Sequence, residues 1–581
     1  MTAKWTPRND TKYTVKHLLQ NITDDNYSLD NSEDFTGTSD TLVSPSTKNY
    51  TGFTAPAIEE VNITADGSRV VEYYYTRNYY TVEMITNGGN EIQAITQKYQ
   101  SELSLPNAER TGYTFGGWFS DINLTLKYTK TQMPAEENIS LYAYWQEETK
   151  PNSFKYILST NVSLSEYTAD DTTVWTPAYI GGLPVTEILY NVYYTNKNIK
   201  KIVIPETITV INQAQFAGCS KLEEVIILGD ITEIGAKAFY NCENLIKVNS
   251  SNEGELLLPN AVETIGQQAF GYCKSIKKAT IPDSVEVISS SVFNGCYSLE
   301  SISIPFVGKT ENAMDKSAVF GIIFGGVLQG HPTAYQWCGK DGWEHFFMPA
   351  TLKEVTITKQ TKIPANAFYN CGDIEKINLA PNTTEIGDSA FKGCSSLSKF
   401  NSNTAGELII PFGMISIGNC AFDSYAYEYL SLIKNINIPD SVTFIGNKAF
   451  NGFTAPEEIV LPFVGNNIDS TESLHAVFGD VIPATLKKIT ITKDTTIPDA
   501  AFAGLTNVEK IELVENTISI GATAFQNCTL LMEIYIPATV TFIGEYAFNG
   551  CSTLAIKYAG AAIPSTWDYN WNANGGTVEF V

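Results

Sequence analysis

The strongest constraint on this chain is a repeat that begins near residue 199 and runs almost to the C-terminus. Segments such as 436–453 (INIPDSVTFIGNKAFNGF) and 534–551 (IYIPATVTFIGEYAFNGC) share one frame, in which Ile-x-Ile-Pro, Val-x-x-Ile-Gly and Ala-Phe recur in the same order. The shortest step between copies is 23 residues, as from Phe216 to Phe239. Self-similarity at such a period is typical of stacked-coil architectures. The repeat therefore predicts a solenoid, in which each coil contacts its two neighbours.

Each part of the frame has a structural interpretation. The alternation of Leu-x-x-Ile-x-Ile predicts a half-buried strand, and the proline after it ends the strand. We expect the glycines that follow to supply backbone angles that other residues avoid, as at Gly235, Gly387, Gly446, Gly521 and Gly544. We expect the phenylalanines to stack from coil to coil as the structural anchors of the repeat; they are Phe216, Phe239, Phe270, Phe293, Phe368, Phe391, Phe422, Phe450, Phe502, Phe525 and Phe548.

Longer blocks of the chain are duplicated as well. NSSNEGELLLP at 249–259 returns as NSNTAGELIIP at 401–411, and PATLKEVTITKQTKIPANAF at 349–368 returns as PATLKKITITKDTTIPDAAF at 483–502. Phe320 and Phe478 belong to longer, degenerate units. Block duplication is a natural way to lengthen a structure whose coils contact only their neighbours.

The pattern Ala-Phe-x-[Gly/Asn]-Cys-x-x-Leu-x-x-Ile-x-Ile-Pro resembles that of the BspA-type (Treponema-type) leucine-rich repeat proteins over about 190–556. The resemblance implies a mainly β chain with short helical or 3-10 turns. We assign 150–556 to a leucine-rich repeat solenoid and 557–581 to a C-terminal cap. It also implies adhesion, because proteins of this type are associated with binding host matrix proteins, host cells or other bacteria.

Two small β modules are expected before the solenoid. Residues 79–149 resemble the Listeria–Bacteroides repeat, also called the InlB B-repeat, which is β-grasp-like; the match is carried by Gly112, Tyr113, Phe115, Gly117, Trp118 and Trp145. Residues 8–78 combine the alternating VVEYYYTRNYYTV (70–82) with an Asp66-Gly67 turn signal and resemble mucin-binding-protein-like modules, β-grasp-like or β-sandwich-like. Residues 146–153 are the expected hinge to the solenoid.

The first residues are interpreted as the remnant of a preceding repeat. Trp5, in AKWTPRND, would correspond to Trp145 in LYAYW. Residues 1–7 would then be the end of that repeat, and we expect the natural chain to continue N-terminally with more modules.

Composition narrows the function classes. The chain has 38 Lys+Arg against 63 Asp+Glu, a net charge of −25, which disfavours nucleic acid and anionic membranes as partners. No stretch reaches the roughly 20 apolar residues of a membrane span. Four histidines in 581 residues leave little material for catalysis or metal binding. We therefore expect no enzyme and no cofactor. The richness in Thr, Asn, Ser and Tyr points to an extracellular protein, secreted or on the bacterial cell surface.

Eight of the ten cysteines share one register of the repeat: Cys219, Cys242, Cys273, Cys296, Cys371, Cys394, Cys528 and Cys551. This is the repeat spacing and not a metal-ligand spacing. We interpret them as a column of small buried side chains. Disulfides between coils are the alternative, which is disfavoured because side chains in one register point the same way.

Two clusters of side chains could in principle bind a metal ion or act in catalysis, but each has a simpler structural interpretation. Cys338 lies near His331 and His345, but their spacing matches no zinc or nucleophile pattern, which favours a loop that packs its aromatics on the solenoid or binds a partner. An acidic cluster lacks the glycine of a calcium loop and is interpreted as a solvated loop; it comprises Asp24, Asp25, Asp30, Glu33 and Asp34.

A protein partner is expected on the outward side of the strands or on the insertions at 306–348 and 463–482. The outward row is mostly small, polar and uncharged, begins at Val203 and Ile226, and has a plain solvated β-face as its alternative. Aromatics gather on the insertions instead, among them Phe306, Phe320 and Phe463. The partner-binding candidates are Thr280, Ser303, Thr356, Asn378, Asn437, Thr490, Glu512, Tyr535, Tyr335, Trp337 and Trp343.

The sequence as a whole predicts a bacterial adhesin that binds host or bacterial proteins non-covalently through the solenoid. Three alternatives stay open: a protein that binds glycans or mucin, a structural spacer for an absent domain, and a scaffold for an enzyme outside this chain.

Overall fold

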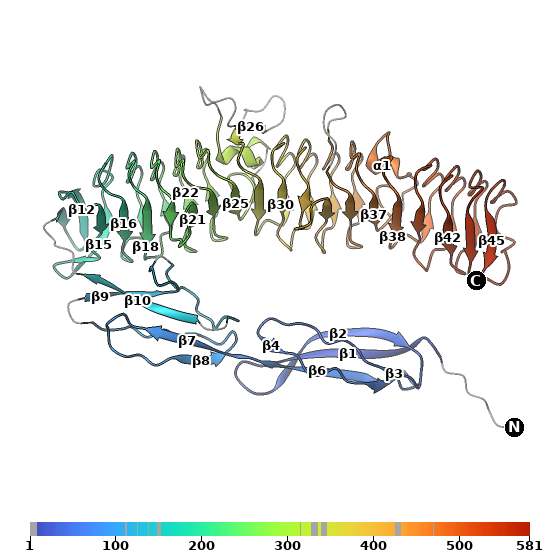
Figure 1. Ribbon diagram of the computed structural model, residues 1–581, viewed down its shortest axis with the longest axis horizontal. Coiled ribbons are helices and arrows are strands. Elements are labelled where there is room, and N and C mark those ends of the chain that lie inside the picture. Colours follow the sequence, from blue (N-terminus) through green and yellow to red (C-terminus); the bar gives the residue numbers. More distant parts are fainter. Residues whose placement is uncertain are drawn as a thin grey trace. The chain divides into compact units, whose positions relative to one another are not determined.

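The computed structural model describes residues 8–110, 113–124, 126–136, 139–147, 153–313, 315–326, 335–338, 346–424, 432–468 and 470–581. The chain divides into two compact units, Met1–Thr149 and Lys150–Val581. Figure 1 labels their elements, which are almost all strands. The expectation of a mainly β chain with short helical turns is confirmed.

The first unit contains two sheets of the same topology. One has the order β2 (Tyr27–Gly37), β1 (Thr11–Gln20), β6 (Val70–Arg77), β4 (Phe53–Thr54), and the other β8 (Ile95–Lys98), β7 (Tyr79–Ile85), β10 (Ile139–Glu147), β9 (Tyr113–Phe119). In each sheet a hairpin supplies the first two strands, and the last strand of the module returns parallel to the first. Strands β3 (Leu42–Val43) and β5 (Val61–Asn62) form a small separate pair. Residues 8–78 thus repeat the strand arrangement of 79–147.

A parallel sheet runs the length of the second unit, with 18 strands among the described residues (Figure 1). Adjacent coils contribute adjacent strands in register, so Ile302 lies beside Ala279 and Val355. In order, the strands are β13 (Thr173–Trp175), β16 (Lys201–Ile204), β18 (Glu224–Ile227), β20 (Lys247–Val248), β21 (Glu255–Leu257), β23 (Lys278–Thr280), β25 (Ser301–Ile304), β28 (Glu354–Ile357), β30 (Lys376–Asn378), β32 (Lys399–Phe400), β33 (Glu407–Ile409), β35 (Asn435–Asn437), β37 (Glu458–Leu461), β38 (Lys488–Ile491), β40 (Lys510–Glu512), β42 (Glu533–Ile536), β44 (Ala555–Tyr558) and β45 (Thr577–Phe580).

Shorter parallel sheets form from the second strand of each coil. They are β17 (Val210–Ile211), β19 (Glu233–Ile234), β22 (Thr264–Ile265) and β24 (Val287–Ile288); then β29 (Lys362–Ile363), β31 (Glu385–Ile386), β34 (Ser416–Ile417) and β36 (Phe444–Ile445); then β39 (Thr496–Ile497), β41 (Ser519–Ile520) and β43 (Phe542–Ile543). The two insertions separate these three sheets. The first insertion holds the 3-10 helices η2 (Asp315–Ala318) and η3 (Phe320–Ile323) and the hairpin β26 (Tyr335–Cys338) to β27 (Phe346–Pro349), and the second holds α1 (His475–Phe478).

A four-stranded sheet precedes the first coil. Its order is β11 (Phe154–Leu158), β12 (Val162–Tyr167), β15 (Leu183–Ile188), β14 (Tyr179–Ile180). Its buried side chains, such as Val162 and Val185, join the same core as the coils. Tyr193, fully buried, continues this core into the aromatic column of the repeat and stacks on Phe216 with ring centroids 5.4 Å apart.

The anchor phenylalanines form a buried column of stacked rings. Within each run of coils, neighbouring rings lie 4.9–5.8 Å apart at interplanar angles of 3–27°. At the insertions Phe324, Phe320 and Phe478 continue the column with larger tilts. It ends edge-on against Trp571, in the predicted cap. A spacing of one ring per coil follows from the strand separation of about 4.8 Å in the sheet.

The repeat glycines serve a different purpose from the expected one. Gly235, Gly387, Gly446, Gly521 and Gly544 are absent from the residues with positive φ, so the expectation of unusual backbone angles there is wrong. A Cβ atom at these positions would lie 2.4–2.6 Å from a backbone nitrogen of the preceding coil, except at Gly446, where the distance is 2.3 Å. Glycine is required there because the two backbones approach too closely for a side chain.

The left-handed backbone occurs elsewhere in each coil, two residues before the anchor phenylalanine. The residues at this position are not glycines, and they have φ between 52° and 63°; they are Ala214, Lys237, Gln268, Ser291, Asn366, Ser389, Cys420, Lys448, Ala500, Thr523 and Tyr546. Hydrogen bonds hold this turn to the next coil, for example from Lys237 N to Gln267 O at 2.8 Å. The ladder of such bonds compensates for the strain of a left-handed conformation in residues with a Cβ.

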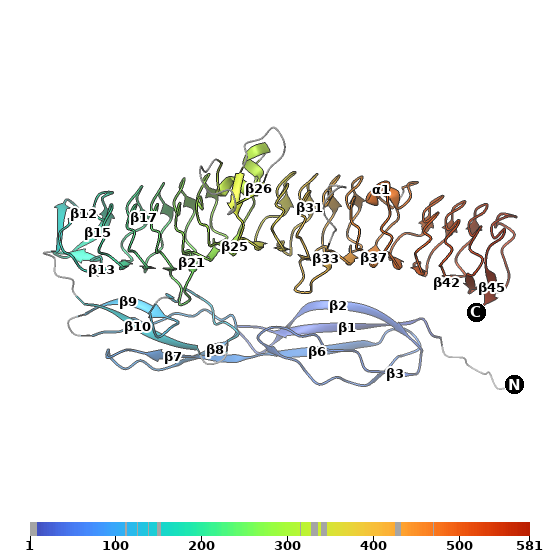
Figure 2. The same ribbon diagram turned by 45° about the horizontal axis from the view of Figure 1, so that its top comes forward.

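Two strands of the long sheet follow their predecessors without a full coil between them. The loop at 249–254 connects β20 directly to β21, and the loop at 401–406 connects β32 to β33. Val248 and Leu256 both point into the core, so each loop returns on the outward side of the sheet, and both project from it in Figure 2. These half-coils are the duplicated NSSNEGEL and NSNTAGEL segments.

Candidate functional site

The stretch of long sheet between the two half-coils presents a row of small, polar and uncharged side chains. Four strands, β23, β25, β28 and β30, lie between β21 and β32. Each strand has two outward positions, and the second of them is occupied by Thr280, Ser303, Thr356 and Asn378 in turn, all half-buried. Asn378 Nδ2 donates to Thr356 Oγ1 at 3.1 Å. We call this surface the central face; it is about 24 Å long between the loops, from five strand spacings.

Ion pairs between neighbouring coils border this face. Where each strand begins, lysine and glutamate tend to alternate from coil to coil: Lys278 Nζ lies 2.9 Å from Glu255, and Lys376 Nζ lies 2.9 Å from Glu354. A second row, one residue earlier, includes Lys434 and Glu457 at 2.9 Å. Because these charges are paired within the solenoid, they present little net charge to a partner.

The remaining strand candidates lie C-terminal to the second half-coil. Asn437 and Tyr535 are exposed, and Thr490 is half-buried. Thr490 Oγ1 donates to Glu512 at 2.9 Å. The ammonium of Lys510, with help from Thr490 and Lys488, lowers the pKa of Glu512 to about 2, so this carboxylate is committed to its neighbours.

Several expectations about exposure are wrong. Val203 and Ile226, expected on the outward row, are 2% and 3% exposed. The insertion aromatics are core residues, because they fill the space of the missing coil strands; Phe306, Phe320, Phe324, Phe346, Phe463 and Phe478 are all buried. Tyr335 and Trp337 lie on β26, opposite Pro349 and Phe347. Trp343, His331 and His345 lie outside the described residues.

The repeat cysteines form a column of thiols that are buried, except for the half-buried Cys394. All eight in the register are free cysteines. Seven donate to a backbone carbonyl of the preceding coil, as Cys242 does to Phe216 O at 3.1 Å and Cys551 to Phe525 O at 2.9 Å. Burial raises the pKa of Cys242 and Cys273 well above the ordinary value. These thiols are therefore structural.

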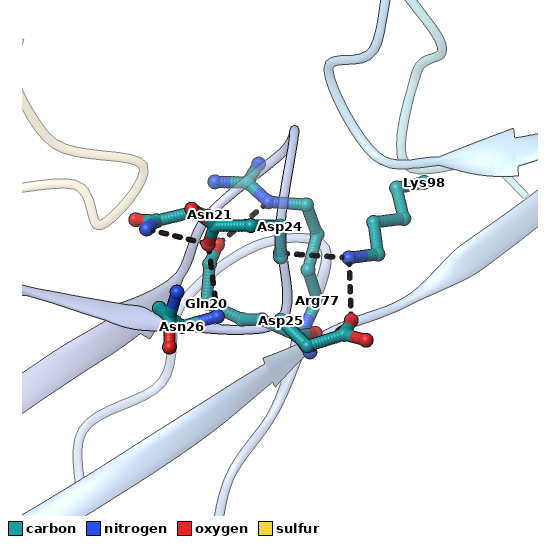
Figure 3. A network of polar contacts seen from close by, with 7 residues as sticks. All are labelled: Gln20, Asn21, Asp24, Asp25, Asn26, Arg77 and Lys98. Carbon is teal, nitrogen blue, oxygen red and sulfur yellow. Dashed lines mark hydrogen bonds and ion pairs between the residues drawn. The ribbon is translucent and has the colours of Figure 1, made fainter.

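The acidic cluster is not a single loop. Asp30, Glu33 and Asp34 lie on strand β2, where Glu33 Oε2 is 3.0 Å from Lys48 Nζ. Asp24 and Asp25 occupy the turn before it. Asp24 Oδ1 accepts from Asn21 Nδ2 and Asn26 N, at 2.9 and 2.8 Å (Figure 3). This turn contacts the second module.

The two N-terminal modules meet at a polar joint that sequence reasoning missed. Lys98 Nζ donates to Asp24 O and Asp25 Oδ1, at 3.1 and 3.0 Å, and Arg77 Nε donates to Gln20 O at 2.9 Å (Figure 3). Arg77 is 7% exposed. Only Asn78 separates β6 from β7. No periodic signal marks such a joint, since its residues lie far apart in sequence.

Arg77 binds both modules at once. Its Nη1 donates to Tyr99 O and Gln100 Oε1 at 3.0 and 2.9 Å, and its guanidinium lies 4.5 Å from the centre of the Phe53 ring. Burial lowers the pKa of Arg77 from its ordinary value. The joint fixes the orientation of the two modules.

Two other kinds of site are absent from the described residues. Within the described ranges, no three or more His, Cys, Asp or Glu side chains lie where they could share a metal ion. In the same part of the chain, no helix has the length and apolar character needed to cross a membrane.

Two protein families match this chain. The model of the BspA type leucine rich repeat region matches in six copies, over residues 186–312, 343–424 and 421–555. The model of the Listeria-Bacteroides repeat domain matches residues 80–144. The BspA-type repeat is a non-enzymatic scaffold for protein interaction, and both repeats are typical of bacterial surface proteins. The likeness of residues 8–78 to mucin-binding-protein-like modules stays a prediction.

Solved structures with leucine-rich repeats are also similar. A leucine-rich repeat protein from Bacteroides ovatus is 21% identical, with 74% of this chain and 98% of that chain covered and a TM-score of 0.29. A leucine rich cell surface protein from Faecalibacterium prausnitzii is 23% identical, with 73% and 97% covered and a TM-score of 0.27. A curated protein of Evansella cellulosilytica is 34% identical over 79 residues, which span 13% of this chain and 12% of that protein.

Proposed function

We propose, from the premise that this chain belongs to the BspA-type leucine-rich repeat family, that it is a bacterial adhesin, secreted or held at the cell surface, which binds a protein on its central face. The observation that carries the proposal is the bracketed surface between the half-coils. It is the one stretch of the long sheet with such loops on both sides among the described residues, and the second outward side chain of each strand, from Thr280 to Asn378, is short. Short side chains allow a partner's backbone and aromatic groups to approach the sheet closely.

The size of the central face sets what a partner must contact. A face of about 24 Å by 10–13 Å offers roughly 240–310 Å². A standard protein interface buries about 800 Å² on each side. The partner must therefore also contact the loops 249–254 and 401–406, which makes them part of the proposed site. Affinity would come from shape and hydrogen bonding, because the flanking lysines and glutamates are already paired.

The test uses full-length chain with Ser303→Arg and Thr356→Arg together, which place two long side chains on the central face. The matched control is Thr443→Arg, an exposed position directly before β36 of a short sheet. Labelled proteins are applied to epithelial cells before and after mild protease treatment. We expect binding that protease treatment abolishes, a loss of at least tenfold in the double variant, and no change in the control.

Other outcomes favour the alternatives. Binding that survives protease treatment supports a glycan receptor, and an unchanged double variant places the contact elsewhere on the chain. If the full chain does not bind, a spacer role or a bacterial partner is the better account. Urea unfolding midpoints of the variants, equal to that of the parent, show that the fold is retained.

A further inference from the structure

A groove of about 590 Å³ opens on the short sheet beside the second insertion. Three successive strands, β39, β41 and β43, contribute Thr496, Ser519 and Phe542 to it. These are the outward positions, because the residues that follow them, Ile497, Ile520 and Ile543, are buried. Ile468, Ser470 and Thr471 line it from the insertion, and Pro498, Asp499 and Gly521 line it from the turns after the strands. Its volume lies within the range of small-ligand sites, about 300–1,000 Å³.

The lining combines hydroxyl groups, carboxylates and an aromatic ring. Five side chains carry hydroxyls, which both donate and accept hydrogen bonds; they are Ser470, Thr471, Thr495, Thr496 and Ser519. Asp494 and Asp499 are acceptors. Phe542 is 46% exposed and Ile468 40%, so apolar surface remains in contact with solvent. No lysine or arginine lines the groove.

The carboxylates argue against two classes of ligand. An anionic ligand would be repelled, since Asp494 and Asp499 face the groove without a cation in its lining. A metal ion would need several carboxylate oxygens, and three of these four already accept from the backbone: Asp494 Oδ1 from Thr496 N at 3.2 Å, Asp494 Oδ2 from Val464 N at 3.4 Å and Asp499 Oδ1 from Ala522 N at 2.6 Å. Asp499 Oδ2 is left as an acceptor for a hydroxyl group. A neutral ligand rich in hydroxyls remains, and the apolar C–H face of a sugar ring suits Phe542.

The equivalent strands of the first block lack the hydroxyl groups of the groove at two positions. The positions of Thr496 and Ser519 are those of Lys362 and Glu385 in the first block, on β29 and β31. There Lys362 Nζ donates to Glu385 Oε1 at 2.7 Å, and the ion pair occupies the surface. The third strand carries Ser416 in place of Phe542. The second block thus differs from its duplicate at all three strand positions that face the groove, whereas Thr495 in the lining has its counterpart in Thr361.

We propose that this groove binds a neutral saccharide, with Phe542 against one face of a sugar ring and the serine, threonine and Asp499 side chains bonded to its hydroxyls. The site is separate from the central face, because it lies on the other, shorter sheet of the coils. It adds a second kind of recognition to the chain and does not depend on the proposed protein partner.

The test is saturation-transfer difference NMR on the full chain. The neutral probes are galactose, N-acetylglucosamine and lactose, and the acidic ones are N-acetylneuraminic acid and glucuronic acid, each at millimolar concentration. The variant Thr496→Lys with Ser519→Glu installs the ion pair of the first block in the groove, and Phe542→Ala removes the ring. The reciprocal control is Lys362→Thr with Glu385→Ser.

We expect saturation transfer to at least one neutral saccharide, strongest on the C–H protons of one ring face, and at most a tenth of that signal for the acidic sugars. Both groove variants should lose it, and the first-block control should keep it. The proposal is overturned by an absence of transfer to every neutral probe, by equal transfer to acidic and neutral sugars, or by a signal that survives Thr496→Lys with Ser519→Glu.

Discussion

The thiol of Cys242 donates a hydrogen bond to the carbonyl oxygen of Phe216, the anchor of the preceding coil, at 3.1 Å. The same relation joins Cys273 to Phe239 and Cys528 to Phe502. Each coil is therefore tied to its predecessor twice at the same point, by a stacked ring and by a thiol. This explains why cysteine, phenylalanine and the 23-residue step recur together.

The buried thiols of the repeat should resist alkylation. Only the thiolate reacts, and burial raises the pKa of Cys219 to about 12. We expect iodoacetamide at pH 8 to leave Cys219 and Cys242 unmodified in the native protein and to modify both in urea, as measured by mass spectrometry. Cys420 is half-buried and should react earlier. Native Cys242 that reacted as fast as in urea would contradict the structure.

Truncation of an anchor should destabilise the solenoid strongly. Phe525 is fully buried between Phe502 and Phe548, so Phe525→Ala leaves a cavity that costs about 3–5 kcal/mol of unfolding free energy. Phe391→Ala should behave in the same way. Phe412, at 85% exposed, is the matched control, and its alanine variant should stay within about 0.5 kcal/mol. Urea unfolding measures all three, and equal midpoints would rule out the anchor role.

Glu255 should make the first half-coil sensitive to acid. Burial alone would raise its pKa, but hydrogen bonds from Ser250, Lys278 and Asn252 lower the pKa to about 2, from an ordinary value of 4.5. The stabilisation is complete above pH 4.5 and disappears as the pH falls through 2. Glu255→Gln should therefore be less stable than the parent at pH 7, with the difference shrinking toward pH 2. Thermal unfolding from pH 2 to 7 measures it.

The exposed Glu286 provides the control for that experiment. Glu286→Gln should follow the parent's stability profile across the same pH range. A constant difference between parent and Glu255→Gln at all pH values would mean that the carboxylate's charge is not what stabilises the loop.

Loss of Arg77 should uncouple the two N-terminal modules. Arg77→Ala leaves the carbonyls of Gln20 and Tyr99 without this donor, at a cost of about 1–3 kcal/mol for each group that stays buried and unpaired. We expect the modules to unfold in two separate calorimetric transitions at lower temperature. Arg8, whose side chain is 73% exposed, is the control. A single, unshifted transition in Arg77→Ala would contradict the joint.

The repeat could be predicted from sequence because equivalent positions in every coil have the same surroundings and therefore require the same type of residue. A residue such as Phe270 must fill the same space as Phe239, so its position follows from counting. The insertions have no such period. The sequence does not show which aromatics of the insertions are buried, and the structure places Phe306 and Phe463 in the core.

Features that depend on contacts between distant segments could not be read from the sequence. In the sequence the repeat glycines resemble turn glycines, because the sequence does not show that Gly521 approaches the backbone of Asp499. The half-coil at 249–254 was visible as a duplicated phrase but not as a loop over the sheet. The groove could not be predicted either, because Ile468, Thr496 and Phe542 are far apart in sequence and meet only where the second insertion interrupts the short sheet.

The repeat glycines also limit which insertions and duplications the chain can accept. Each repeat glycine must sit opposite the backbone of the preceding coil, so a single residue inserted between it and the anchor would move a Cβ atom into that contact. Duplication of a whole block preserves every contact between a repeat glycine and the preceding coil. The architecture therefore tolerates growth by whole coils and resists change within them, and a duplicated coil can acquire new binding chemistry, as we propose for Thr496 and Ser519.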